Sequence, residues 1–132
     1  NLLGAREPEI YGSATLGELV AQCREWAARH GLEIEDHQSN HEGDLIDFIH
    51  DAIGRCGAIV INPGAYAHTS YALHDAITAS ALPTIEVHLS DINAREPWRA
   101  ESVTAPACVE VISGRGADGY RAALEMLAGR SG

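Results

Sequence analysis

Lysine is absent from this chain of 132 residues, and all nine of its basic side chains are arginines. Chemistry that needs a lysine amine is therefore excluded, namely Schiff-base catalysis, lysine-bound pyridoxal phosphate and the lysine of a phosphate-binding P-loop. The formal net charge is -10, which argues against a nucleic-acid partner because such a partner needs a basic face. An anionic substrate would need a local positive site against this overall field.

Cysteines and long apolar runs are also scarce. Cys23, Cys56 and Cys108 lie far apart and show neither the spacing of metal ligands nor a paired redox motif. They favour free thiols in a reducing compartment, so we expect a cytoplasmic location. No apolar stretch approaches the roughly 20 residues of a membrane-spanning helix. The length and the hydrophobic fraction of 45% predict a single domain over residues 1–132.

Predicted helices and strands alternate along the chain, which indicates an α/β fold with a parallel sheet covered on both faces. Apolar residues at helical spacing predict the helices, and short β-branched runs predict the strands. Thr15 is the expected N-cap of the first helix, with Glu18 three residues later. The expected helices are 16–30, 43–56, 70–81 and 118–128, and the expected strands are 32–39, 58–62, 83–88 and 108–112.

The opening of the chain departs from this pattern. A doubly wound domain normally begins with a central strand, whereas residues 1–14 read as a loop punctuated by Gly and Pro. We therefore expect residues that precede Asn1 to supply the first strand.

Polar side chains end two neighbouring predicted strands. Asn62 follows one strand, and Glu86, His88 and Ser90 end or follow the next. In open α/β sheets ligands bind at the carboxyl ends of the strands. A carboxylate that shares a face with an imidazole stabilises its protonated form and fixes its tautomer, which prepares a general acid. A satisfied polar pair on a buried strand is the alternative, and the nearby Asn62 and Ser90 favour an enzyme.

Three further groups are candidates for the same site. His68 lies in the loop that follows Asn62. Arg95 and Arg99 stand four residues apart and could supply positive charge to an anionic or polyhydroxylated substrate, unless they form a solvated surface pair with neighbouring glutamates. Arg6 and Tyr11 share the opening loop, where a nearby arginine would stabilise a tyrosine phenolate that can act as a base.

Four segments together resemble type II 3-dehydroquinate dehydratase. They are residues 1–12, with the Arg-Glu-Pro-x-x-Tyr-Gly loop, 38–47, 62–70 and 86–96. The resemblance implies a flavodoxin-like three-layer fold and a homododecamer built as a tetramer of trimers. It also implies dehydration of 3-dehydroquinate to 3-dehydroshikimate in the shikimate pathway, the route to aromatic amino acids, without a metal or cofactor. The lack of lysine fits, because the unrelated type I enzyme needs a Schiff-base lysine.

The resemblance also implies roles for individual residues. Tyr11 resembles the base that removes the C2 proton, and Arg6 resembles the loop arginine that favours its phenolate. His88, supported by Glu86, resembles the acid that protonates the departing C1 hydroxyl. The remaining matches are Asn62, Leu89 and Ser90 at the carboxylate and C1 hydroxyl, His68 and Arg99 at ring hydroxyls, Arg95 near Tyr11, and Asp75 at a neighbouring subunit's site.

Two departures and two alternatives accompany this interpretation. Asp91 and Asn93 stand where the family commonly has Asn and His, and the family's first strand with its Gly-Pro-Asn-Leu motif is not in the sequence.

The alternatives are a non-catalytic flavodoxin-like module that binds a flavin or nucleotide, and an inactive homologue. No Gly-rich phosphate loop supports the first, and the retained Arg6, Tyr11 and His88 argue against the second. Biosynthetic and quinate-degrading roles fit the residues equally well.

Overall fold

A parallel three-stranded sheet forms the centre of the computed structural model, which describes residues 15–91, 97 and 101–131. Its strands are β1 (Ile59–Ile61), β2 (Thr84–His88) and β3 (Glu110–Ser113), in the order β1-β2-β3. In the register of the sheet Ile61 pairs with Glu86, which in turn pairs with Val111. The predicted parallel sheet is therefore confirmed, and the carboxyl ends of its strands share one edge.

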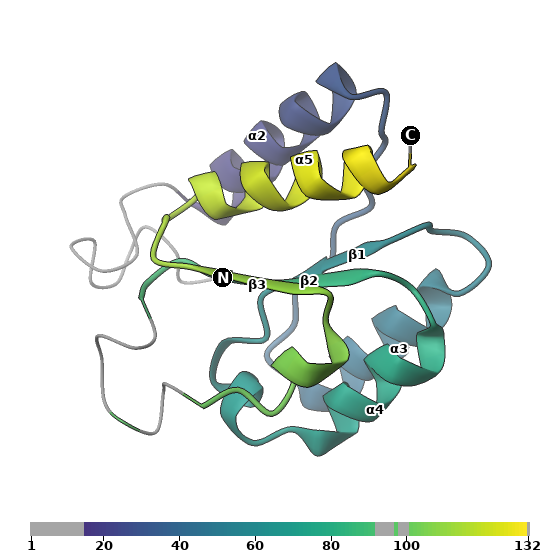
Figure 1. The fold of residues 1–132 in the computed structure, drawn as a ribbon, viewed down its shortest axis with the longest axis vertical. Helices are drawn as coiled ribbons and strands as arrows, with labels where there is room; N and C mark the ends of the chain where they lie inside the picture. Colours follow the sequence, from purple (N-terminus) through teal and green to yellow (C-terminus); the bar gives the residue numbers. More distant parts are fainter. Residues whose placement is uncertain (1–14, 92–96, 98–100, 132) are drawn as a thin grey trace.

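Helices cover both faces of this sheet (Figure 1). The helices α2 (Leu16–Arg29) and α5 (Asp118–Ser131) lie on one face, and α3 (Glu42–Ala52) and α4 (Tyr71–Ser80) lie on the other. Thr15 caps α2 as predicted, because its Oγ1 accepts a hydrogen bond of 3.2 Å from the Glu18 amide. The four predicted helices are confirmed, although α3 ends four residues earlier than expected. No helix of the described residues is long and apolar enough to cross a membrane.

Two apolar cores lie between the sheet and its helices. The core under α5 contains Ile85 and Val87 of β2 together with Ile112. The core under α3 and α4 contains Ile61 of β1 and residues such as Leu73. Because side chains alternate across a strand, β2 gives its odd-numbered residues to the α5 core. Its even-numbered residues therefore face the α4 side.

The predicted strand over residues 32–39 is not formed. The segment has no assigned strand structure among the described residues, although residues 32–40 line the same cleft as Val60 of β1. An extended segment becomes a strand only when a neighbouring backbone supplies a hydrogen-bond ladder, and alternation in the sequence does not supply one. The sequence analysis also missed two short 3₁₀ helices, η1 (Gly64–His68) and η4 (Ala105–Ala107).

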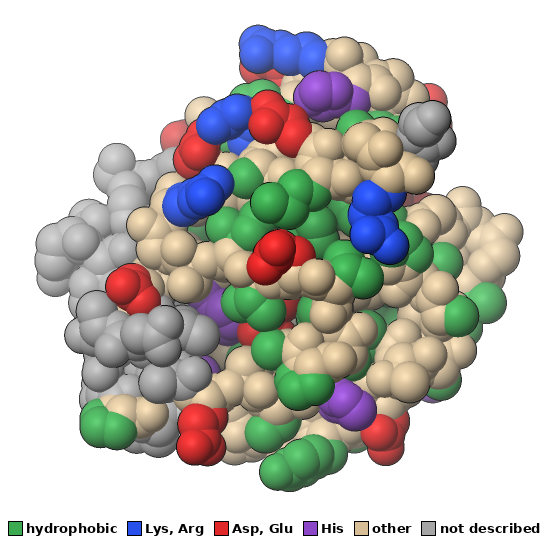
Figure 2. Space-filling view, in the orientation of Figure 1, with side chains coloured by type: hydrophobic (Ala, Val, Ile, Leu, Met, Phe, Trp, Pro, Cys, Tyr) green, Lys and Arg blue, Asp and Glu red, His purple; other side chains and the backbone are tan. Residues whose placement is uncertain are grey.

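Surface arginines are largely used in ion pairs. On the face shown in Figure 2, basic and acidic side chains lie intermixed over α2 and α5. Arg121 bonds Asp118 at 2.6 Å and Glu125 at 2.8 Å on α5. Among the described residues, Arg24 also pairs with Asp36, Arg29 with Glu25, and Arg55 with Glu35. Exposed pairs of this kind contribute little to stability.

Candidate active site

Five of the predicted site residues meet at the carboxyl edge of the sheet. Asn62 follows β1, and His68 ends η1. His88 ends β2 and is followed by Leu89 and Ser90. All five line a single cleft. The structure therefore brings together residues that the sequence placed at two separate strand ends.

A tight turn after β1 places Asn62 and His68. The Asn62 Oδ1 accepts a hydrogen bond of 3.0 Å from the Gly64 amide. Gly64 has φ of 59°, a left-handed backbone that glycine adopts without a steric cost. The turn opens η1, which directs the chain back so that the His68 ring stacks on His88 with 6.5 Å between ring centroids. Both imidazoles therefore belong to one site.

Glu86 lies behind His88 and is completely buried. Its Oε2 is 2.8 Å from the His88 Nε2, and it also accepts a hydrogen bond of 2.8 Å from the Ser102 hydroxyl. Its Oε1 accepts a hydrogen bond from the Thr104 hydroxyl. Burial raises the pKa of Glu86, but the three hydrogen bonds together outweigh burial and hold that pKa below its ordinary value. Glu86 is thus a carboxylate, and the His88 Nε2 must carry the hydrogen that it donates.

Ser102 and Thr104 are site residues that the sequence analysis missed. Both lie between the predicted strands 83–88 and 108–112, and their partner Glu86 stands 16 and 18 residues earlier in the chain. A Ser-x-Thr pair in a polar loop contains no sequence signal for so distant a partner. Only the fold shows that these hydroxyls serve Glu86.

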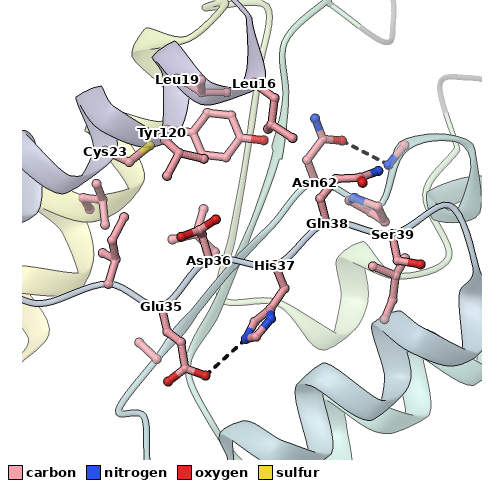
Figure 3. Close-up of a pocket in the computed structure, with 18 of the residues that line it drawn as sticks. Leu16, Leu19, Cys23, Glu35, Asp36, His37, Gln38, Ser39, Asn62 and Tyr120 are labelled. Atoms are coloured by element: carbon pink, nitrogen blue, oxygen red, sulfur yellow. Dashed lines mark hydrogen bonds and ion pairs between the residues drawn. The ribbon is translucent and has the colours of Figure 1, made fainter. Parts of the chain in front are cut away.

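The cleft continues from the histidines towards α2 and α5. Figure 3 shows Leu16, Leu19, Cys23 and Tyr120 on one part of its wall and residues 35–39 on another. Its volume is about 1280 Å³, which exceeds the roughly 300–1,000 Å³ of ordinary ligand sites. Burial raises the pKa of Tyr120 to about 12, although a hydrogen bond with Asn62 opposes the rise. Tyr120 is therefore a neutral phenol at physiological pH and is unsuited to act as a base.

Asp75 is the remaining predicted residue that the structure describes, and it does not line the cleft. Asp75 lies on α4 with its side chain 84% exposed, 3.3 Å from the Nδ1 of His74. Arg6, Tyr11, Arg95 and Arg99 lie outside the described residues. Within the part of the chain that the structure describes, no group of three or more His, Cys, Asp and Glu side chains could hold a metal ion.

The fold and the site together define an acid–base enzyme built on an α/β sheet. A histidine at the carboxyl edge, held by a buried carboxylate, can donate or accept one proton at the nitrogen that does not contact Glu86. A second imidazole and an amide side chain face the same cleft and can bind polar groups of a small molecule.

Comparison with known proteins identifies the family. The family model for dehydroquinase class II matches residues 1–128. A 3-dehydroquinate dehydratase from Chelativorans sp. is 60% identical over 98% of this chain and 90% of its own length. A second, from Pseudomonas putida, is 56% identical over 97% of this chain and 86% of its own length.

A solved structure gives the same result for the fold. The crystal structure of a type II dehydroquinase from Butyrivibrio crossotus superposes with a TM-score of 0.93 at 45% identity, covering 96% of this chain and 89% of the other. The chain belongs to the class II dehydroquinase family. The predicted family and the predicted flavodoxin-like α/β fold are therefore confirmed.

Proposed function

We propose that this chain dehydrates 3-dehydroquinate to 3-dehydroshikimate, with Tyr11 as the base and His88 as the acid. The reaction is that of a hydro-lyase, as the family and the relatives' names indicate. The Tyr11 phenolate takes the proton from C2, and the electron pair of that C–H bond forms an enolate. The enolate then expels the C1 hydroxyl in a trans elimination, and His88 protonates it, so that one water leaves.

The Glu86–His88 pair is the observation that carries the assignment of the acid. The His88 Nε2 is engaged in a hydrogen bond with Glu86, so Nδ1 is the nitrogen that can donate a proton to the substrate. A charged imidazolium formed at this position is stabilised by the buried carboxylate 2.8 Å away. A non-catalytic binding module would have no use for an ionised carboxylate buried behind a cleft histidine.

The other site residues bind the substrate in this proposal. Asn62 uses its Oδ1 for the Gly64 amide and one hydrogen of its NH₂ group for Tyr120, so the second hydrogen is proposed to bind the substrate carboxylate, next to the Leu89–Ser90 segment. His68 and Arg99 contact ring hydroxyls. The two other proposed contributors are Arg6 beside the Tyr11 phenolate and Arg95 near Tyr11.

The described part of the cleft has little free positive charge, because Arg55, which lines it, is paired with Glu35. Four of the described arginines form surface ion pairs. Arg6, Arg95 and Arg99 are therefore proposed to provide the local positive field that an anionic substrate requires against a net charge of -10.

Assembly and location complete the proposal. The chain functions as one domain over residues 1–132 within a cytoplasmic homododecamer. Asp75 is exposed on α4, and Tyr71, one helical turn earlier, is 70% exposed. An exposed aromatic ring beside a carboxylate is suited to a subunit contact, and there Asp75 would reach a neighbour's site. Sedimentation at assay concentration tests this part, because a fully active monomer contradicts a shared site.

The decisive experiment follows the absorbance of the enone product formed from 3-dehydroquinate. The wild type is expected to turn over, and Tyr11→Phe is expected to lose almost all activity because only the ionisable oxygen is removed. His88→Ala is expected to lower kcat by roughly 10²–10⁴-fold with substrate binding largely retained.

The matched control is His50→Ala, which removes an exposed histidine at the end of α3 and is expected to leave kcat unchanged. Wild-type turnover in Tyr11→Phe would place the base elsewhere. Wild-type turnover in His88→Ala would remove the acid from the proposal.

A further inference from the structure

Residues 101–104 form a short strap that holds both active-site histidines. The Glu101 carbonyl accepts a hydrogen bond from the His68 Nδ1. The Val103 amide donates a hydrogen bond of 2.7 Å to the Ala67 carbonyl. In the same four residues the Ser102 and Thr104 hydroxyls reach Glu86, the partner of His88. We call residues 101–104 the strap.

Both hydroxyls of the strap lie within hydrogen-bond distance of Glu86 as donors, and their oxygens are 3.1 Å from each other. The Ser102 Oγ accepts a hydrogen bond of 3.0 Å from the Ala105 amide, which leaves its own hydrogen for Glu86. Thr104 and Glu86 are both completely buried, so neither group has water as a substitute partner. A carboxylate that receives three donors must be ionised, because a protonated carboxyl would have to donate one of these bonds itself.

We propose that Thr104 and Ser102 are positioning residues, which act through Glu86 to keep a proton on the His88 Nε2 and to present the His88 Nδ1 to the substrate. The inference rests on the proposed role of His88 as the acid. Neither hydroxyl touches the reacting atoms. Their effect is to fix the rotamer and the charge of Glu86, and through Glu86 the tautomer and direction of the imidazole.

The charge of Glu86 also predicts a change in the pH profile. The groups that face Glu86 are His88 on the same strand, the Ser102 and Thr104 hydroxyls of the strap, and Cys108 after η4, with His68 beyond His88. Loss of a donor raises the pKa of Glu86. Protonation of Glu86 adds a second fall of kcat on the acidic limb, below the one set by the base, and this second fall should then begin at a higher pH.

The test compares two threonines with the same burial. Thr104→Val removes the hydroxyl that donates to Glu86. Thr84→Val is the matched control, because Thr84 is also completely buried but donates at 3.0 Å to the Leu82 carbonyl and not to Glu86. The two substitutions remove the same atom at equal depth, and Thr104→Val should cost more thermal stability than Thr84→Val, because its lost hydrogen bond goes to a charged group.

Of the two threonine-to-valine substitutions, only Thr104→Val should alter catalysis. Its kcat should fall roughly 10-fold, the equivalent of one hydrogen bond to a charged group, with KM changed less than about 2-fold. The second fall on its acidic limb should move to higher pH, and Ser102→Ala should move it in the same direction. Thr104→Ser should restore both kcat and the position of that fall, because serine keeps the donor.

Two results would separate this inference from the function on which it rests. If Thr104→Val matches Thr84→Val in kcat and in pH profile while His88→Ala remains inactive, the positioning role is wrong and the acid assignment stands. If His88→Ala turns over like the wild type, both are wrong. A fall in kcat that Thr104→Ser does not reverse would assign Thr104 a packing role and also overturns the inference.

Discussion

The two faces of β2 are both buried, but one packs against apolar side chains and the other carries polar side chains with specific partners. Ile85 and Val87 face the α5 core and pack in its cluster of hydrophobic side chains. Thr84, Glu86 and His88 face the other way and are just as inaccessible, yet each carries a polar group with a specific partner. Five consecutive residues thus divide into a packing face and a polar face, of which Glu86 and His88 form the chemical face, and this shows that depth of burial alone does not distinguish core from site.

The physical terms that stabilise the two faces differ in kind. Each fully buried aliphatic side chain of the packing face gains about 1.5–3 kcal/mol from transfer out of water. On the chemical face, transfer out of water is unfavourable, because an ionised carboxylate is strongly disfavoured in the interior unless hydrogen bonds compensate it. Three donors surround Glu86, and the buried side-chain polar atoms that the structure describes all have partners.

The largest effect is expected on the packing face. Ile85→Ala should lower the free energy of unfolding by about 2–5 kcal/mol, since it removes most of a side chain that is 1% exposed and leaves a cavity. The kcat of the folded fraction should stay close to the wild type. Urea unfolding and the enone assay measure the two quantities. A selective fall in kcat with unchanged stability would show that the two faces are not separate.

A smaller, pH-dependent effect is expected on the chemical face. The pKa of Glu86 is lower in the folded protein than in an unfolded chain, so the unfolded state binds more protons near that pKa. The stabilisation from its ionised form is complete above the unfolded pKa of about 4.3 and is lost as the pH falls through the lower, folded pKa. Glu86→Gln abolishes this titration.

Urea unfolding of the wild type and Glu86→Gln between pH 7 and pH 3 should therefore give curves that are not parallel. The wild type should lose more stability than the variant as the pH falls below about 4.3. All other carboxyl groups are common to both proteins and cancel in the comparison. Parallel curves would mean that Glu86 has no lowered pKa in the folded state.

The sequence was most informative where a signal is local. The β-branched runs predicted β1 and β2, and the polar residues at their ends predicted Asn62, Glu86 and His88 as neighbours. The sequence also contains a signal for the end of α3, because a glycine commonly follows a helix. Gly54 does so here, with φ of 82°. The predicted helix continued to residue 56 because this glycine was not taken as a helix end.

The sequence was silent where a feature depends on tertiary contacts. Residues 32–39 alternate like a strand, but alternation specifies a face and not a partner. Ser102 and Thr104 contact Glu86 only in the folded chain, because they stand 16 and 18 residues after it in the sequence. Asp75 lies on α4 away from the cleft, and its predicted role depends on a second subunit.

The smallest predicted effect concerns a thiol that reports the charge on the chemical face. Burial and the nearby Glu86 raise the pKa of Cys108 to about 12. Burial and Asp36 raise the pKa of Cys23 to about 11, and Cys23 is on α2, across the sheet from Glu86. Both thiols should react slowly with iodoacetamide at pH 8, since the thiolate is the reactive form.

Glu86→Gln should accelerate alkylation of Cys108 by about 2- to 5-fold, because loss of one negative charge lowers the pKa of the thiol while burial, the larger cause, remains. Alkylation of Cys23 should not change, which makes it the control within the same molecule. Mass spectrometry of the two peptides after timed reaction measures both rates. Equal acceleration at both cysteines would indicate general loosening of the fold. An unchanged rate at Cys108 would mean that the charge of Glu86 does not raise the pKa of this thiol. Glu86 would then act on its surroundings through its hydrogen bonds and not through its charge.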